Sequence, residues 1–303
     1  MNNKINEFIN QVKKYHKGDI EIIKKILAVY LSGGNLLIND VPGTGKSNLS
    51  KIIAKSIDLT TKRVQFTSDL MASDILGVKI YDPILKNWNV SKGPIFEDIV
   101  FADEINRAPP QTQSALLEAM SEKQVSIEGE TFKLNENHFV IATQNPNEFS
   151  GTYPLPEAQL DRFTACLTLG YLSEEDEIEV IMRDDFDLSK IKPILNSEDI
   201  KLLKKEINDI PIHKDIAGII VKILNESRKL ADSGEIKNGL SVRSGLALKQ
   251  MCKAYVFIND IKMITPDVVF LLASDVLKHR ISDETKMSKI LHNVKENVYD
   301  KTK

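Results

Sequence analysis

Cysteine is almost absent from this chain of 303 residues, which contains only Cys166 and Cys252. They lie far apart, and their spacing indicates neither a disulfide framework nor a zinc site. We expect both to be small apolar core residues in a protein of a reducing compartment. The five histidines likewise show no spacing typical of a metal site.

Long apolar runs are also missing from the sequence. The most apolar late stretch, residues 268–277, is too short to span a bilayer, and Ser274 and Asp275 interrupt it. Residues 1–7 are polar and lack the apolar region of a signal peptide. We therefore expect a cytoplasmic protein without a membrane span.

The chain has no excess of positive charge, because 40 basic residues face 43 acidic ones for a net charge of -3. This balance disfavours non-specific nucleic-acid binding. Arginine is scarce among the basic residues, and a chain that defaults to lysine reserves arginine for sites that need a planar, bidentate cation. The seven candidates are Arg63, Arg107, Arg162, Arg183, Arg228, Arg243 and Arg280.

The sequence does contain an alternation of helical and strand patterns over its first two-thirds. Hydrophobic residues make up 42% and charged residues 27%, a balance typical of a globular protein. Helices are predicted over residues 20–31 and from about 46 to 56. Short apolar strands between helices predict a parallel five-stranded sheet covered on both faces, an α/β fold. The predicted strands are 36–38, 63–67, 99–102, 139–143 and 166–169.

Two segments interrupt this alternation. Residues 77–93 resemble an insertion, and residues 124–134 alternate apolar and polar side chains around Gly129, as a β-hairpin does. After Gly170 the pattern becomes helical, with helix starts at Ser173 and at Thr265-Pro266. We predict a nucleotide-binding domain over residues 1–170 and a helical domain over residues 171–303.

A phosphate-binding loop follows the first predicted strand. Glycines let backbone N–H groups curl around a phosphate, the lysine reaches the β- and γ-phosphates, and the serine hydroxyl coordinates Mg²⁺. Asp40 stands where the generic pattern begins with glycine, but the strand before the loop and the helix after it are intact. We predict that ATP is bound by Asp40, Val41, Pro42, Gly43, Thr44, Gly45, Lys46, Ser47 and Asn48.

Two carboxylates complete the pattern at the end of the strand predicted at residues 99–102. Asp103 belongs beside the Mg²⁺, which we expect Ser47 to bind directly and Asp103 to bind through water. Glu104 belongs where it can orient the attacking water. An Asp-Glu pair after a strand is often only a solvated loop end. Its position about 56 residues after Lys46 favours the catalytic interpretation.

Several long motifs of this sequence resemble those of one protein family. The stretches Gly93-Pro94-Ile95-Phe96, 102–110, 111–120, 142–146 and 151–163 resemble the MoxR family of AAA+ ATPases. The Asp-Val-Pro-Gly form of the loop, including Asp40, is similar to that of this family. The resemblance covers roughly residues 18–280 and implies an AAA+ three-layer αβα core followed by a C-terminal helical lid.

The resemblance also assigns roles near the nucleotide. Asn145 matches sensor 1, which helps to position the attacking water, and a turn-forming Asn-Pro is the alternative or an additional role. Gly18 resembles the remnant of an adenine-side motif. Thr67 matches the place of the polar residue that gates the catalytic glutamate in related ATPases, although a strand-terminal threonine is often only a cap.

Three arginines are candidates for contacts with the nucleotide or with a neighbouring subunit. Arg162 matches the arginine finger, which acts in trans on the nucleotide of a neighbouring subunit, and an ion pair with Asp161 or Glu157 is the alternative. Arg243 matches sensor 2 of the lid, with a surface helical arginine as the competing interpretation. Arg107 is a second candidate for the trans-acting arginine because it lies close to Glu104.

The resemblance implies a homo-oligomer, typically a hexameric ring, that uses ATP and Mg²⁺ to remodel, mature or activate client proteins. Its partners often bear a von Willebrand factor A domain. A nucleic-acid motor or loader of the helicase-related AAA+ type is the alternative, disfavoured by the charge and by the absence of a zinc or helix-turn-helix module. A nucleotide-dependent switch with little turnover is a third class.

Overall fold

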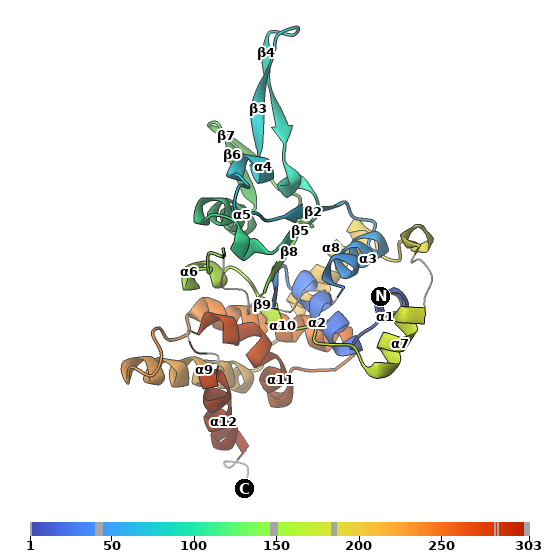
Figure 1. Ribbon diagram of the computed structural model, residues 1–303. Coiled ribbons are helices and arrows are strands. Elements are labelled where there is room, and N and C mark those ends of the chain that lie inside the picture. Colours follow the sequence, from blue (N-terminus) through green and yellow to red (C-terminus); the bar gives the residue numbers. More distant parts are fainter. Residues whose placement is uncertain are drawn as a thin grey trace.

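The computed structural model describes residues 2–39, 45–145, 151–182, 187–281, 283 and 285–299. A central parallel sheet organises the first half of the chain (Figure 1). Its strands lie in the spatial order β2 (Thr61–Gln65), β5 (Ile99–Asp103), β8 (Phe139–Gln144), β1 (Leu36–Asn39) and β9 (Ala165–Leu167). The predicted five-stranded parallel sheet is therefore confirmed, with β2 two residues earlier than predicted.

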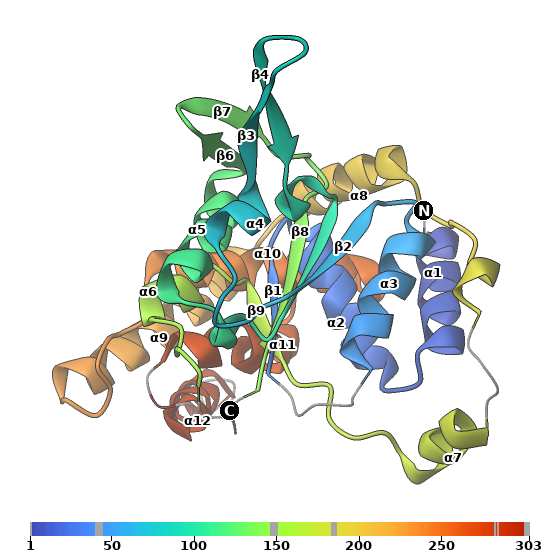
Figure 2. The same ribbon diagram turned by 45° about the horizontal axis from the view of Figure 1, so that its top comes forward.

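Both faces of the sheet are apolar because both are covered by helices. Leu36 and Ile38 point to one face, whereas Leu37 between them points to the other, as the two-residue period of a strand requires. The first face packs against α1 (Asn2–Tyr15), α2 (Ile20–Leu31) and α3 (Lys46–Ser56), and the second against α4 (Ala72–Leu76) and α5 (Pro110–Glu122). This is the three-layer αβα arrangement (Figure 2).

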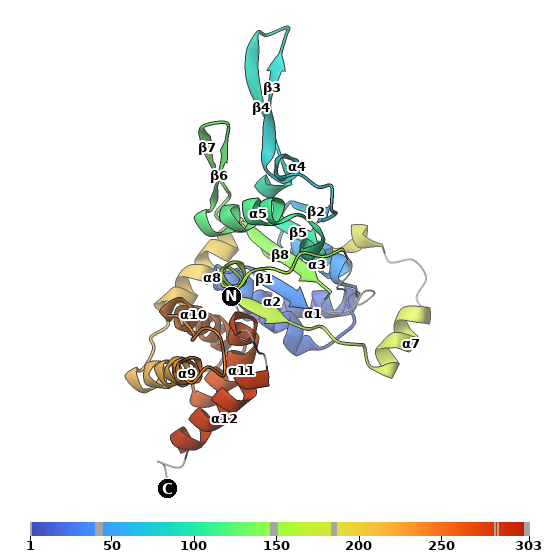
Figure 3. The same ribbon diagram turned by 60° about the vertical axis from the view of Figure 1, so that its left-hand side comes forward.

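Short elements connect the strands and carry the two insertions. The predicted hairpin is confirmed as β6 (Gln124–Ile127) and β7 (Glu130–Lys133), and the first insertion forms a second hairpin, β3 (Gly77–Asp82) and β4 (Asn87–Lys92). Both hairpins extend beyond one end of the sheet (Figure 3). The remaining short elements here are η1 (Pro94–Phe96), η2 (Ile105–Arg107) and α6 (Glu157–Leu160).

The described part of the chain after β9 is helical, as predicted. It contains α7 (Glu174–Met182), η3 (Leu188–Lys190), α8 (Ser197–Asp209), α9 (Lys214–Asp232), α10 (Val242–Ile258), α11 (Pro266–Leu277), η4 (Lys278–Arg280) and α12 (Thr285–Tyr299). The predicted cap at Thr265 is confirmed, since its Oγ1 accepts from the N–H of Val268. No helix among the described residues is long and apolar enough to cross a membrane.

One apolar cluster continues from the sheet into these C-terminal helices. Leu27 in α2, Leu203 in α8 and Met251 in α10 all belong to it. The lid helices therefore pack on the first face of the core. The division of the chain at residue 170 remains a prediction, because burial does not mark a break there.

Candidate functional site

The carboxyl ends of the parallel strands bring the predicted nucleotide-binding residues together. Asn39, Asp103 and Gln144 end β1, β5 and β8, which are neighbours in the sheet. Helix α3 begins at Lys46, shortly after β1, and the half-buried Asn145 directly follows β8. All of these residues therefore lie at one edge of the sheet, where ligands of open α/β folds bind. The predicted loop residues Asp40, Val41, Pro42, Gly43 and Thr44 lie outside the described residues.

The start of α3 has the conformation that a phosphate site requires. Gly45 precedes the helix with φ 77°, a left-handed conformation that costs a glycine little. Its carbonyl oxygen accepts from the N–H groups of Asn48 and Leu49 and so closes the first turn. The N–H groups that a helix leaves unpaired at its start, together with its dipole, favour an anion there. Lys46 and Ser47 are half-buried at this helix start.

Asp103 is buried and held from both sides. Thr143 Oγ1 in β8 donates to its Oδ1 at 2.7 Å. On the other side, the guanidinium of Arg63 in β2 donates to its Oδ2 through Nη2 at 2.6 Å and Nε at 3.1 Å. Neither partner was assigned to the site from the sequence. The scarcity of arginine was the signal that could have identified Arg63.

Glu104 has a strained backbone and a fully engaged carboxylate oxygen. Its φ of 57° and ψ of 51° are left-handed, a conformation that costs a non-glycine residue roughly 1–2 kcal/mol. Its N–H donates to Thr143 Oγ1 at 2.8 Å. Its Oε2 accepts from Gln65 Nε2 at 2.6 Å and lies 3.0 Å from Nε of Arg107. Such strain, fixed by surrounding contacts, is typical of functional positions.

The expected gating role of Thr67 is not supported by these contacts. Strand β2 ends at Gln65, two residues before the predicted end, so Gln65 faces Glu104. Thr67 is exposed, and its side chain bonds to Asp69, which holds the pKa of that carboxyl below its ordinary value. The strand was predicted to end at Thr67 because the apolar Phe66 continues the strand pattern beyond Gln65.

The residues at this edge fit a nucleotide-bound Mg²⁺. Each carboxylate oxygen can accept more than one hydrogen bond, so the pairs to Thr143 and Arg63 leave Asp103 able to accept from a metal-bound water. Within the described ranges, no group of three or more His, Cys, Asp or Glu residues could hold a metal ion. Mg²⁺ keeps several waters and relies on substrate phosphates, so a single protein carboxylate can serve it.

A small pocket lies beside the start of α3. Its lining includes His16, Gly18, Ile22, Leu49 and Leu169. Gly18 has φ 145°, which side-chain-bearing residues rarely adopt. Burial lowers the pKa of His16 to about 4, so this ring is neutral at pH 7. Lys17 and Asp19 also line this pocket, and the adenine-side role of Gly18 remains a prediction.

Arg162 lies at the opposite edge of the sheet. It precedes β9, and the N–H of the neighbouring Thr164 donates to the carbonyl of Asn35, just before β1. These are the amino ends of parallel strands, whereas Lys46 follows the carboxyl end of β1. Arg162 Nη1 donates to the carbonyl oxygen of Leu117 at 3.0 Å. Neither of the ion pairs considered as alternatives is seen, since Asp161 and Glu157 have other partners.

Arg243 lies near Arg162 and not beside Lys46. Its Nη1 is 3.8 Å from Asp161 Oδ2, and its side chain is 70% exposed. On the other side of Asp161, Arg280 is buried, with Nε 3.3 Å from Oδ1. Burial lowers the pKa of Arg280 to about 10, and the nearby Asp161 opposes that shift. The expectation that the lid arginine touches the nucleotide of its own chain therefore has no support in this arrangement.

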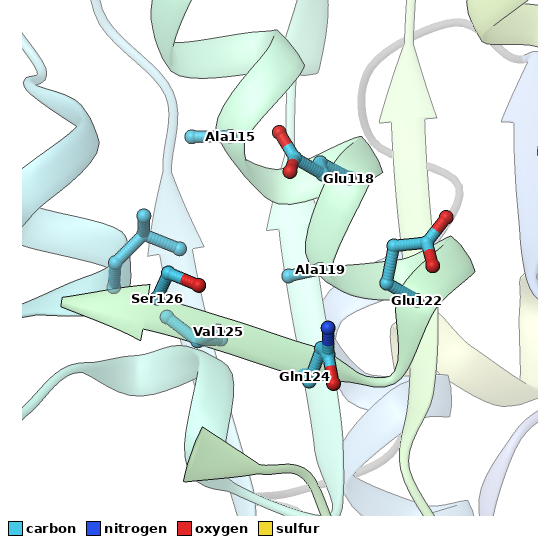
Figure 4. Close-up of a pocket in the computed structure, with 8 residues that line it drawn as sticks. Ala115, Glu118, Ala119, Glu122, Gln124, Val125 and Ser126 are labelled. Carbon is cyan, nitrogen blue, oxygen red and sulfur yellow. The ribbon is translucent and has the colours of Figure 1, made fainter. Parts of the chain in front are cut away.

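A further pocket of about 130 Å³ lies between α5 and β6, away from these residues (Figure 4). Glu118 and Glu122 line it from α5, and Gln124, Val125 and Ser126 line it from β6. No basic side chain lines this pocket, and its two carboxylates would repel a triphosphate. The candidate nucleotide site is therefore the edge that carries Lys46 and Asp103.

Comparisons with known proteins agree with this geometry. A family model described as "ATPase family associated with various cellular activities (AAA)" matches residues 35–165. The chain is 35% identical over 279 residues to "Chaperone MoxR1" of Mycobacterium tuberculosis, covering 90% of this chain and 74% of that protein. It is 41% identical over 277 residues to the protein YeaC of Bacillus subtilis, covering 91% and 85%.

A solved structure resembles the whole arrangement. This crystal structure of a candidate ATPase from Cytophaga hutchinsonii superposes with a TM-score of 0.86 at 36% sequence identity. The match covers 97% of this chain and 93% of that one. The likeness therefore includes the helices after β9 as well as the sheet.

Proposed function

Because the chain belongs to the MoxR family of AAA+ ATPases, we propose that it hydrolyses ATP to remodel, mature or activate partner proteins. The observation that carries this proposal is the pair Asp103-Glu104 at the end of β5, beside the start of α3. A phosphate site alone supports only binding. A buried carboxylate and a strained second carboxylate at the same edge support hydrolysis.

In this proposal the chain divides the work among a few side chains. Lys46 and the helix start hold the phosphates, and Ser47 and Asp103 hold the Mg²⁺ that accompanies ATP. Bound there, Mg²⁺ neutralises charge on the phosphate oxygens. Glu104 orients the attacking water once Oε2 is released from Gln65 and Arg107. Asn145, at the end of β8, positions the same water.

The active form in this proposal is a ring, with six subunits as in the family that it resembles. Arg162 is on the edge of the sheet remote from its own Lys46, so it can only serve the nucleotide of another copy. Arg107 is engaged with Glu104 of its own chain, which favours Arg162 as the trans-acting arginine. A cation supplied by a neighbour stabilises charge in the transition state and couples hydrolysis to assembly.

The β3–β4 hairpin is the proposed client-contacting element. It exposes large apolar side chains, including Ile84 at 89%, Leu85 at 66% and Trp88 at 62%. Contiguous exposed apolar side chains mark interaction sites. Clients are proposed to include proteins with a von Willebrand factor A domain, and the relative named as a chaperone agrees with a protein client.

The test replaces Glu104 with glutamine, which keeps the shape of the side chain and removes its charge. We expect Glu104→Gln to bind ATP like the wild type and to hydrolyse it at least about 100-fold more slowly. Phosphate release and equilibrium nucleotide binding are measured on the same preparations. An unchanged hydrolysis rate would show that the catalytic assignment is wrong, and loss of binding would point to a structural role.

A further inference from the structure

Helix α7 presents an apolar stripe that no other part of the described chain covers. None of its residues is buried, and Ile178, Ile181 and Met182 are 50%, 82% and 78% exposed. They are three and four residues apart and therefore share one helix face. Glu175 and Glu177 lie at the same spacing from Ile178 and Ile181. The stripe is thus flanked by negative charge.

The first turns of α10 present a stripe of the opposite charge. Val242 and Leu246 are four residues apart and are 65% and 51% exposed. Arg243 and Lys249 each lie three residues from Leu246, on the same face. A short apolar stripe on α10 is therefore flanked by positive charge, whereas the stripe on α7 is flanked by negative charge.

The two stripes face opposite ends of the same molecule. Helix α7 follows β9 and its carboxyl edge, and an ion pair of 2.6 Å joins Glu179 to Lys17, which lines the pocket at the start of α3. Helix α10 begins beside Asp161, at the amino edge. Figures 2 and 3 show α7 at one side of the molecule and the lid helices α9 and α12 at the other. One chain cannot bring its own stripes together.

We infer that the stripe on α7 of one copy packs against the stripe on α10 of the next copy. This inference rests on the proposed function, because a ring that brings Arg162 to the neighbour's Lys46 also apposes these two sides. The contact is heterologous, with different surfaces on each copy, as ring closure requires. It places Glu175 and Glu177 opposite Arg243 and Lys249, and it would hold the neighbour's Arg243 near the nucleotide side.

Charge complementarity selects a second copy over an unrelated client as the occupant. An apolar stripe alone accepts many partners, whereas two stripes with matched apolar spacing and opposite flanking charges specify each other. Each stripe is small, so the contact supplements a larger interface and fixes its register.

Two singly substituted chains test the contact directly. Ile181→Cys and Leu246→Cys introduce exposed thiols, and the native Cys166 and Cys252 are buried. Both variants also carry Glu104→Gln, so that ATP is not consumed during oxidation. We expect a disulfide-linked dimer when the two variants are mixed with ATP and Mg²⁺, and none from either variant alone. Linkage within one variant would indicate a symmetric contact and overturn the inference.

Charge exchange provides a second test that does not depend on cysteine. Glu177→Lys and Lys249→Glu should each weaken assembly in sedimentation at low salt, and the double variant should restore it. Wild-type ATP hydrolysis reports separately on the proposed function. Assembly and hydrolysis without the mixed disulfide or the charge rescue would overturn the α7–α10 contact alone. Absence of hydrolysis would instead contradict the proposed function.

Discussion

Glu104 Oε2 accepts a hydrogen bond from Gln65 and lies beside the guanidinium of Arg107. A carboxylate that orients water needs a free lone pair directed at that water. The contacts with Gln65 and Arg107 instead direct Oε2 of Glu104 toward other side chains of the protein. Under the proposed function this arrangement is a restrained form of the site, and Glu104 is released from it when nucleotide and a neighbouring copy bind.

Gln65→Ala tests whether this restraint limits the basal rate. A hydrogen bond to a charged group contributes about 1.5–3 kcal/mol, so its loss is expected to raise basal hydrolysis by roughly 10- to 150-fold. Thr67→Ala is the matched control, since Thr67 is exposed and bonds to Asp69. It should leave the rate unchanged. A Gln65→Ala rate as low as that of Glu104→Gln would mean that Gln65 orients the carboxylate and does not restrain it.

His279 makes stability depend on pH at the junction of the core and lid. Its Nε2 lies 3.1 Å from the carbonyl of Phe163, so this nitrogen carries the hydrogen. Burial, and then the adjacent Arg280, lower the pKa of His279 to about 3. Because the folded pKa lies below the unfolded one, the unfolded chain binds more protons between the two values. Stability from this group is therefore full above pH 6.5 and falls as the solution is acidified.

We expect His279 to remove up to about 2 kcal/mol of unfolding free energy between pH 6.5 and pH 5. His279→Gln keeps a donor near the Nε2 position but does not titrate, so its stability should fall less over this range. Urea unfolding at pH 7 and pH 5 measures the difference. His292→Gln, at a 70% exposed position, should behave like the wild type. Equal losses in all three chains would contradict the assignment.

Residue types at motif positions could be predicted from the sequence, but their partners could not. Asp103 and Glu104 follow an apolar strand, and that pattern is visible in the chain. Arg63, Gln65 and Thr143 reach them only because β2 and β8 flank β5 in the sheet. A spatial neighbour from another strand leaves no local signal, so these three residues needed the structure.

At the scale of elements, the two hairpins differ in how visible they were. The β6–β7 hairpin alternates apolar and polar residues, and Val125 and Ile127 are buried as that pattern predicts. The β3–β4 hairpin exposes most of its apolar side chains. The hydrophobicity of these residues therefore did not reveal that they are exposed. Lys79 of β3 and Glu130 of β7 form a 2.6 Å ion pair that links the two hairpins.

Trp88 makes the β3–β4 hairpin directly observable, since it is the only tryptophan in the chain. We expect red-shifted emission from this exposed indole and a blue shift when an unfolded, tryptophan-free polypeptide is added. Replacing Ile84 and Leu85 with serine should abolish the shift and preserve ATP hydrolysis. Leu271→Ser removes a leucine from α11 that is 50% exposed and should keep the shift. A shift that survives the hairpin substitutions would place the client elsewhere.

At the scale of the molecule, the sheet order explains why Arg162 and Lys46 of one chain lie at opposite edges of the sheet. The parallel fold and the helical second half followed from the pattern of apolar segments. The sequence pattern did not show that Arg243 and Arg162 share one edge of the sheet, because Asp161 and the packing of the lid bring them together. In the proposed function the active unit is an interface between copies, so its test must combine chains.

Mixing inactive variants tests that interface. Lys46→Ala lacks the phosphate-binding lysine and Arg162→Ala lacks the trans-acting arginine, so each homomeric ring should be inactive. In a random equal mixture, about a quarter of the interfaces pair an intact Lys46 with an intact Arg162, and activity should return to roughly that fraction.

Lys46→Ala mixed with Glu104→Gln is the control, because both positions lie on the same side of the interface. That mixture should stay inactive, because Lys46 and Glu104 of one site come from the same chain and neither variant carries both. If the first mixture also stayed inactive although the chains had assembled together, Arg162 would not act in trans.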